Sequence, residues 1–204
     1  MTFPEITFAN VLDYIGTLAF AISGIRLAST KRFDWFGAYV VGLATAIGGG
    51  TVRDLLLDVP VFWMRNGVYF LITLLALLLV VLFGKVVVRQ KYTWFIFDTI
   101  GLGMFAVIGI EKTLGVGYPF WVAIVMGSVT GAGGGVIRDV FLNEVPLIFR
   151  AEIYAVACVL GGLAYWACHL CGWGNVSCGL VCGSRDFVES LGRSLPNQPA
   201  DAPR

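Results

Sequence analysis

Two short segments place charged side chains where lipid-facing residues would be expected. The first, AIGGGTVRDLLLDVP, covers residues 46–60, and the second, AGGGVIRDVFLNEVP, covers residues 132–146. In each segment, three glycines are followed by an arginine and an aspartate. Ionisable residues inside apolar spans are costly, and they usually mark the route of an ion or a polar substrate. The pattern therefore predicts transport chemistry. Its charged residues are Arg53, Asp54, Arg138 and Asp139.

The rest of the chain predicts an all-α integral membrane protein. Of 204 residues, 58% are apolar and 13% are charged, and the mean hydropathy is +0.84. Runs of about 20 apolar residues are long enough to cross a bilayer as helices. We expect six spans near residues 10–27, 35–57, 67–88, 93–112, 118–142 and 151–172.

The sequence contains an internal duplication. DYIGTLAFAISG at residues 13–24 matches DTIGLGMFAVIG at residues 98–109, and the glycine motif recurs with the same spacing of 85 residues. Each unit has an odd number of spans, so the second unit must be inverted relative to the first, as in many secondary transporters. A duplication that merely builds a helical bundle is the alternative. We divide the chain into an N-terminus (1–9), two three-span repeats (10–90 and 91–172) and a tail (173–204).

The glycine triads lie near the middle of spans 2 and 5. Three consecutive glycines weaken a helix, so we expect these spans to kink or unwind around a polar cavity and to act as a hinge. Close helix packing through small residues is the alternative. Nearby threonines would line the constriction, unless each bonds to its own preceding turn. The candidate residues are Gly48, Gly49, Gly50, Gly133, Gly134, Gly135, Thr45, Thr130 and Thr51.

The buried charges need partners. Neighbouring side chains on a helix diverge by about 100°, so we expect the arginine and aspartate of one motif not to neutralise each other. Similar depth in the membrane predicts the pairs Asp13–Arg53 and Asp98–Arg138, either direct or bridged by water. The alternative is that the arginines extend to the lipid headgroups.

The distribution of basic residues predicts the orientation. Connections after spans 1, 3 and 5 are richer in lysine and arginine than those after spans 2 and 4, where we count only Arg65 and Lys112. The basic residues counted in the richer connections are Arg26, Lys31, Arg32, Lys85, Arg89, Lys91 and Arg150. By the positive-inside rule, the N-terminus lies outside the cell.

Other classes of function find little support. A net charge of +1 indicates no nucleic-acid partner. No nucleophile motif, phosphate loop or pair of metal-binding histidines is present, so we expect neither an enzyme nor a cofactor. The CHLC segment at residues 168–171 contains His169, but it lies beside an apolar span, and we expect no metal site there.

The paired glycine motifs and the paired DYIG and DTIG segments resemble the bacterial family related to trimeric intracellular cation (TRIC) channels, also described as a glycine-transporter family. The resemblance covers residues 10–172. It implies a homotrimer in the bacterial inner membrane, with one pore in each protomer, conduction of monovalent cations and seven spans. The family's seventh span should follow the sixth, but residues 174–191 depart from the family there. Their apolar part is only about ten residues long, which is too short to cross the membrane unaided. We expect a short or re-entrant segment there.

Two functions fit these features. A broken helix offers carbonyl oxygens to a cation and amide hydrogens to a carboxylate. The sequence therefore predicts a potassium-type channel, with a carrier for glycine or another small zwitterion as the alternative. A purely structural membrane scaffold is the third class. Besides the permeant species, membrane lipids are the expected partners.

Overall fold

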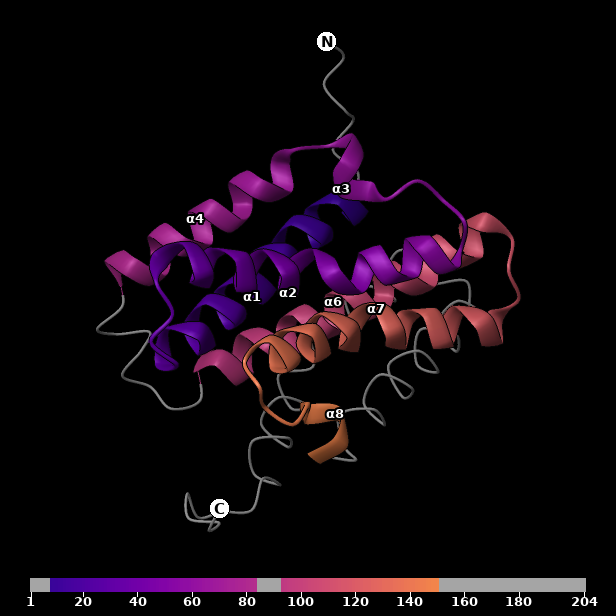
Figure 1. The fold of residues 1–204 in the computed structure, drawn as a ribbon. Helices are drawn as coiled ribbons and strands as arrows, with labels where there is room; N and C mark the ends of the chain where they lie inside the picture. Colours follow the sequence, from indigo (N-terminus) through magenta and orange to yellow (C-terminus); the bar gives the residue numbers. More distant parts are fainter. Residues whose placement is uncertain (1–7, 84–92, 151–204) are drawn as a thin grey trace.

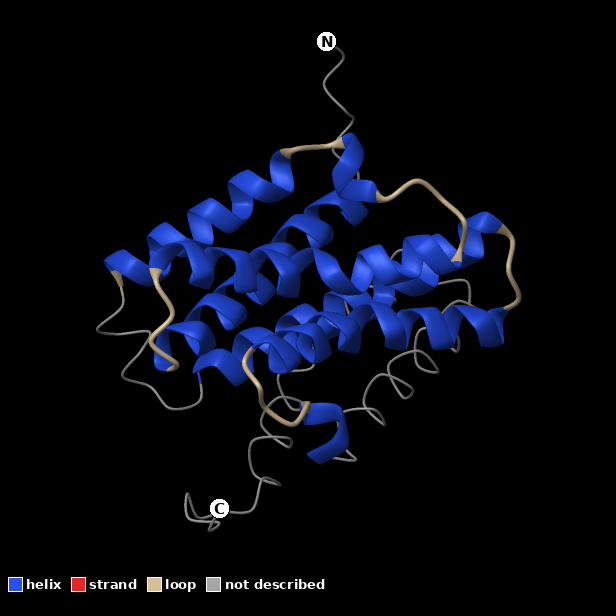
Figure 2. Ribbon diagram, in the orientation of Figure 1, coloured by secondary structure: helices blue, strands red, loops and turns tan. Residues whose placement is uncertain are grey.

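The protein is a bundle of α-helices (Figures 1 and 2). The computed structural model describes residues 8–83 and 93–150, and these contain no strand. The helices are α1 (Phe8–Thr30), α2 (Trp35–Leu56), α3 (Phe62–Arg65), α4 (Val68–Leu82), α6 (Thr93–Val116), α7 (Phe120–Phe141) and α8 (Leu147–Arg150).

The helices confirm the membrane class and most of the expected spans. Four of them, α1, α2, α6 and α7, are long and apolar enough to cross a membrane. The expected third span, residues 67–88, contains α4, which is a shorter apolar helix, and residues 84–88 lie outside the described part of the chain. The sixth expected span (151–172) and the short segment at 174–191 lie outside the described residues.

Helices α2 and α7 cross at the centre of the bundle and run in opposite directions (Figure 1). Helix α1 packs against α2, α4 and α6, and α6 also packs against α7. The short helices α3 and α8 follow α2 and α7 and lie on opposite sides of the bundle in Figure 1. Equivalent parts of the two halves therefore face opposite ways.

The two central helices end in the same manner. Asp58 and Asn143 have positive φ values of 53° and 54°. The amide of Val59 donates to the carbonyl of Asp54 at 3.0 Å, and the equivalent bond in the second half is 2.8 Å long. These contacts form a Schellman motif, which ends a helix and reverses the chain. The motif directs the chain from each central helix into the following short helix.

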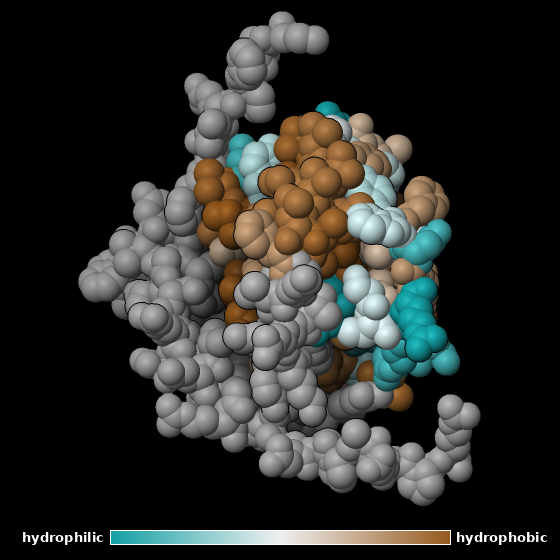
Figure 3. Space-filling model, turned by 90° about the vertical axis from the view of Figure 1, so that its left-hand side faces the viewer, coloured by the Kyte–Doolittle hydropathy of each residue, from teal (hydrophilic) through white to brown (hydrophobic). Residues whose placement is uncertain are grey.

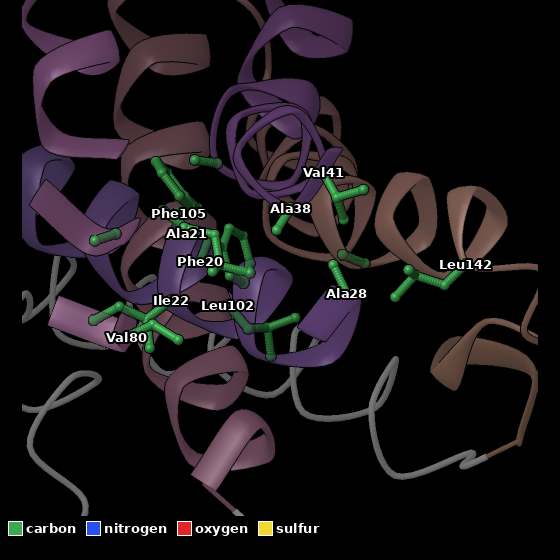
Figure 4. Close-up of a cluster of buried hydrophobic side chains, with 14 residues drawn as sticks. Phe20, Ala21, Ile22, Ala28, Ala38, Val41, Val80, Leu102, Phe105 and Leu142 are labelled. Carbon is green, nitrogen blue, oxygen red and sulfur yellow. The ribbon is translucent and has the colours of Figure 1, made fainter. Parts of the chain in front are cut away.

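The hydrophobic core contains another equivalent pair. Phe20 of α1 and Phe105 of α6 are 85 positions apart, and their ring centroids lie 5.2 Å apart (Figure 4). Both rings are buried, beside the fully buried Ala21 and the nearby Leu102. The two halves thus meet across a contact between equivalent aromatic residues.

Large apolar side chains are also exposed on the outside of the bundle. Leu71, Leu75, Leu78 and Leu82 of α4 are each at least 49% exposed. Figure 3 shows apolar residues gathered in a broad brown area at one end of the described surface. A surface of this kind suits contact with lipid or with another apolar protein surface.

Candidate functional site

Each arginine bonds the aspartate that follows it. Arg53 Nε donates to Asp54 Oδ1 at 2.8 Å, and Arg138 Nε donates to Asp139 Oδ1, also at 2.8 Å. The expectation that neighbouring residues would not neutralise each other was therefore wrong. Their Cβ atoms do diverge around the helix, but the long arginine side chain curls back far enough to reach the short carboxylate.

The same carboxylates hold the short helices in place. Asp54 Oδ2 accepts a hydrogen bond from the Phe62 amide at 3.0 Å, and Asp139 Oδ2 accepts one from the Leu147 amide at 3.1 Å. Phe62 and Leu147 are the first residues of α3 and α8. The first amides of a helix lack partners within it, so a carboxylate there is favourable.

In the second half, a buried arginine joins three elements. Arg138 forms an ion pair with Asp98 of α6, and both side chains are fully buried. Its Nη1 atom also donates to Ser23 Oγ of α1 at 2.7 Å. The predicted Asp98–Arg138 pair is therefore present as a direct contact. The guanidinium does not extend to the surface, which contradicts the headgroup alternative for this arginine.

The cluster around Arg53 in the first half includes a lysine from α6 of the second half. Lys112 Nζ donates to both carboxylate oxygens of Asp54, at 2.8 and 2.9 Å. The Lys112 ammonium and the Arg53 guanidinium lie 6.0 and 5.9 Å from the centroid of the Phe62 ring, within the range of cation–π attraction. Asp54 is thus fully buried between two cations and a backbone amide.

The predicted Asp13–Arg53 pair is not a direct contact. Asp13 Oδ2 instead accepts a hydrogen bond from the Tyr69 hydroxyl of α4, while Arg53 bonds Asp54. Asp13 and Arg53 nevertheless lie in the same part of the bundle, because Tyr69, which bonds Asp13, and Arg53 both contact the Phe62 ring. The depth argument placed Asp13 near Arg53, but it did not include the competing tyrosine.

Two basic residues counted as loop charges lie within helices. Arg26 belongs to α1 and is only 5% exposed, and Lys112 belongs to α6. Both were assigned to connections between spans because the apolar runs end just before them. Within the described residues, Lys31 and Arg32 remain the basic residues of the connection between α1 and α2.

The central helices continue through the glycine triads. Helix α2 runs without interruption from Trp35 to Leu56, and α7 from Phe120 to Phe141. The expected unwinding was therefore wrong, whereas the kink and the hinge at the triads stay predictions. Neighbouring helices supply close contacts that keep the weak glycine segments helical.

The triads allow α2 and α7 to approach through their backbones. A Cβ atom added to Gly49 would collide with the Thr130 carbonyl oxygen, and one added to Gly134 would collide with the Thr45 carbonyl oxygen. A Cβ on Gly133 would lie 3.1 Å from the Gly49 Cα. These positions carry no side chain because the opposite backbone occupies that space.

The other glycines of the triads have different surroundings. A Cβ on Gly48 would meet the flexible end of Ile137, and one on Gly50 would lie 2.6 Å from Phe62 Cε1. Gly135 is buried in α7. The crossing thus depends most on Gly49 and Gly134, which are 85 positions apart.

The three candidate threonines bond to their own helices. Thr45 Oγ1 donates to the Val41 carbonyl at 2.6 Å, Thr130 Oγ1 makes the equivalent bond at 2.5 Å, and Thr51 Oγ1 bonds Ile47 at 2.7 Å. The Thr51 hydroxyl also accepts a hydrogen bond from Trp63 at 2.9 Å. The hydroxyls of all three threonines therefore follow the alternative expectation, in which each bonds to the preceding turn of its own helix.

Replacing Thr45 with valine should therefore have little effect on folding. The substitution removes a local hydrogen bond without leaving a donor unpaired, and valine has nearly the same shape. We expect the free energy of unfolding to fall by at most about 1 kcal/mol, measured by thermal unfolding in detergent. Thr130→Val is the matched variant. A much larger loss in either variant would contradict this role of the hydroxyl.

Sequence reasoning did not assign site roles to Lys112, Ser23 or Tyr69. Lys112 follows an apolar run and looks like a loop residue, and single serines and tyrosines are common in membrane helices. The available signal was charge balance, because the buried aspartates of the first half need more than one cation. The cysteines and His169 lie outside the described residues, as do residues 173–204.

Taken together, the charged side chains form two clusters at the ends of α2 and α7. Each cluster combines an arginine, a carboxylate and the start of a short helix, and each draws a further polar group from a neighbouring helix. Buried ion pairs with several possible partners are typical of ion pathways in membrane proteins.

Comparisons with known proteins agree with this description. The family model described as Glycine transporter matches residues 10–85 and again residues 95–170. The UPF0126 inner membrane protein YadS of Escherichia coli is 42% identical over 160 residues, which cover 76% of this chain and 75% of that protein. YvgT of Bacillus subtilis, named a UPF0126 membrane protein, is 43% identical over 157 residues, covering 76% of this chain and 77% of that protein.

Two solved structures with a similar fold are described as TRIC channels. The TRIC trimeric intracellular cation channel orthologue from Rhodobacter sphaeroides has a TM-score of 0.84 and 33% identity, covering 92% of this chain and 98% of that chain. A prokaryotic TRIC channel, solved in 0.5 M KCl, has a TM-score of 0.81 and 30% identity, covering 90% of this chain and 93% of that chain.

Proposed function

The chain belongs to the family described as Glycine transporter, and on that premise we propose that it is a channel for monovalent cations of the potassium type. The observation that carries the proposal is the likeness of the whole fold to TRIC cation channels. The buried carboxylates give this likeness a chemical basis, because Asp54 and Asp98 are fully buried among helices that cross the membrane. The cluster around Arg138 combines two carboxylates, Asp98 and Asp139, with one arginine, and this balance favours cations over anions.

We place the path beside the α2–α7 crossing, between the clusters around Arg53 and Arg138. The glycine contacts support a hinge at this point, because a backbone contact without interlocking side chains allows one helix to move against the other. This movement is a rigid shift of continuous helices. The residues that carry it are Gly48, Gly49, Gly50, Gly133, Gly134 and Gly135, with Thr45, Thr51 and Thr130 beside them.

The finer features of the proposal concern assembly and placement. We place the protein in the bacterial inner membrane, as the name of the E. coli relative states for that protein, with the N-terminus outside. It assembles as a homotrimer with one path in each protomer. The exposed apolar residues of the bundle support contacts with lipids and with other protomers.

A carrier for glycine or a similar zwitterion is the second candidate, and the description of the matching family favours it. Its structural basis was a broken helix whose free amides would bind a carboxylate. Helices α2 and α7 are unbroken, so they do not offer such amides at their centres.

Reconstitution of the full chain into lipid membranes tests the choice. We expect unitary currents in KCl that are absent from protein-free membranes and unaffected by added glycine. The matching flux assay uses labelled glycine and liposomes. Saturable uptake of glycine without unitary currents would overturn the channel in favour of the carrier, and the absence of both would indicate a structural protein.

A further inference from the structure

The two halves contain the same charged unit in two different arrangements. In the second half, Arg138 joins α7 to α6 through Asp98. In the first half, the equivalent aspartate, Asp13, bonds Tyr69, and Arg53 stays with Asp54. The α6–α7 pair is therefore linked by an ion pair, whereas the corresponding ion pair between α1 and α2 is absent.

Tyr69 is firmly held in the position that it occupies. Its side chain is buried, with 6% exposure, at the start of α4. Its ring packs edge-on against Phe62, with centroids 4.6 Å apart, and against Tyr14, with centroids 5.9 Å apart. Two aromatic neighbours thus fix the ring, and the hydroxyl lies at the carboxylate of Asp13.

Arg53 would have a second partner if Asp13 were released. Asp54 also bonds Lys112 and the Phe62 amide, so it keeps partners if Arg53 turns away. Tyr69 and Arg53 both contact the Phe62 ring, so the Asp13 carboxylate that Tyr69 bonds lies in the same part of the bundle as Arg53. A hydrogen bond between two charged groups is stronger than one from a neutral hydroxyl. The tyrosine hydroxyl is what opposes this pairing.

We propose that Tyr69 is a positioning residue that holds Asp13 away from Arg53 and so keeps the first half of the path open. An Asp13–Arg53 pair would join α1 to α2, as Asp98–Arg138 joins α6 to α7. The inference rests on the proposed function, because it assumes that cations pass these charged groups. The two ends of the path therefore differ in this structure. At one end the Asp98–Arg138 ion pair joins α6 to α7, whereas at the other end Asp13 bonds Tyr69 and not Arg53.

The test is Tyr69→Phe, which removes the hydroxyl and keeps the ring contacts with Phe62 and Tyr14. We expect the open probability of the channel in KCl to fall about tenfold, the factor that one charge-assisted hydrogen bond supplies. Tyr14→Phe is the matched control. The Tyr14 hydroxyl contacts Asn66 and not Asp13, so its removal should leave the currents unchanged.

A double variant separates this mechanism from general damage. Tyr69→Phe combined with Asp13→Asn removes the charge that Arg53 would bind, so the open probability should return to within about twofold of wild type. Wild-type currents in Tyr69→Phe, or a double variant as impaired as the single one, would overturn the inference.

A measurement of melting temperature tests the positioning role of Tyr69 even if the wild-type protein carries no current. Asp13→Asn should lower the melting temperature more in the Tyr69→Phe background than in wild type, because only there does it break an ion pair. Equal shifts in both backgrounds would overturn the positioning role. Wild-type protein without current would overturn the proposed function alone, so the two failures are distinguishable.

Discussion

Replacing Arg138 with glutamine is expected to destabilise the folded protein by about 3–5 kcal/mol, the usual cost of breaking a buried ion pair. The Arg138 side chain is fully buried and serves Asp98, Asp139 and Ser23 at once. Glutamine cannot neutralise either carboxylate, so Asp98 would lose the arginine with which it pairs inside the bundle. Thermal unfolding in detergent, followed by tryptophan fluorescence, measures the loss.

Arg53→Gln is the matched control for this variant. Asp54 keeps its two bonds to Lys112 and its bond to the Phe62 amide when Arg53 is lost. We therefore expect a clearly smaller fall in melting temperature than for Arg138→Gln. Equal losses in the two variants would show that the different partners in the two halves do not determine stability.

Gly49→Ala is expected to have the second-largest effect. Its Cβ would overlap the Thr130 carbonyl oxygen, and a backbone atom cannot turn aside as a flexible side chain can. Helices α2 and α7 would have to separate, at a cost of about 1–3 kcal/mol for an overpacked interior. Gly134→Ala should behave alike, since its Cβ meets the Thr45 carbonyl oxygen. Melting temperatures in detergent measure both.

Gly103→Ala provides the control for the two glycine variants. It changes the same residue type in α6, but nothing lies within 4 Å of the added Cβ. Alanine favours a helix by up to about 1 kcal/mol over glycine, so this variant should be as stable as wild type or slightly more stable. If all three alanine variants melted alike, the close crossing of α2 and α7 would not be what requires glycine.

Much of the architecture could be predicted because apolar runs and repeats are explicit in a sequence. The spacing of 85 residues pairs Phe20 with Phe105 and Gly49 with Gly134, and the structure places each pair at the contact between the two halves. Depth in the membrane was enough to predict the Asp98–Arg138 ion pair.

The remaining contacts of the site depend on side-chain reach, which residue spacing does not reveal. The rule that neighbours on a helix diverge holds for Cβ atoms, but the arginine side chain is long enough to overcome it. Lys112 lies at the end of an apolar run, so its sequence position fits a loop as well as a helix. The hydrogen bond from Tyr69 to Asp13 joins residues 56 positions apart.

The glycine triads show why one pattern allowed two interpretations. Consecutive glycines permit both an unwound segment and a close helix crossing, because both require the absence of a Cβ atom. The choice depends on what lies opposite. Here the backbone of the other central helix lies opposite, and both helices remain continuous. A single sequence does not identify that neighbour.

The reversal potential of the reconstituted protein in a KCl gradient tests the central claim most directly. The buried carboxylates along α2 and α7 predict a path that selects cations, so the reversal potential should move toward the potassium equilibrium potential. Replacing potassium with a large organic cation should abolish the inward current carried by potassium. A reversal potential at zero or toward chloride, or membranes that carry no current, would contradict the account.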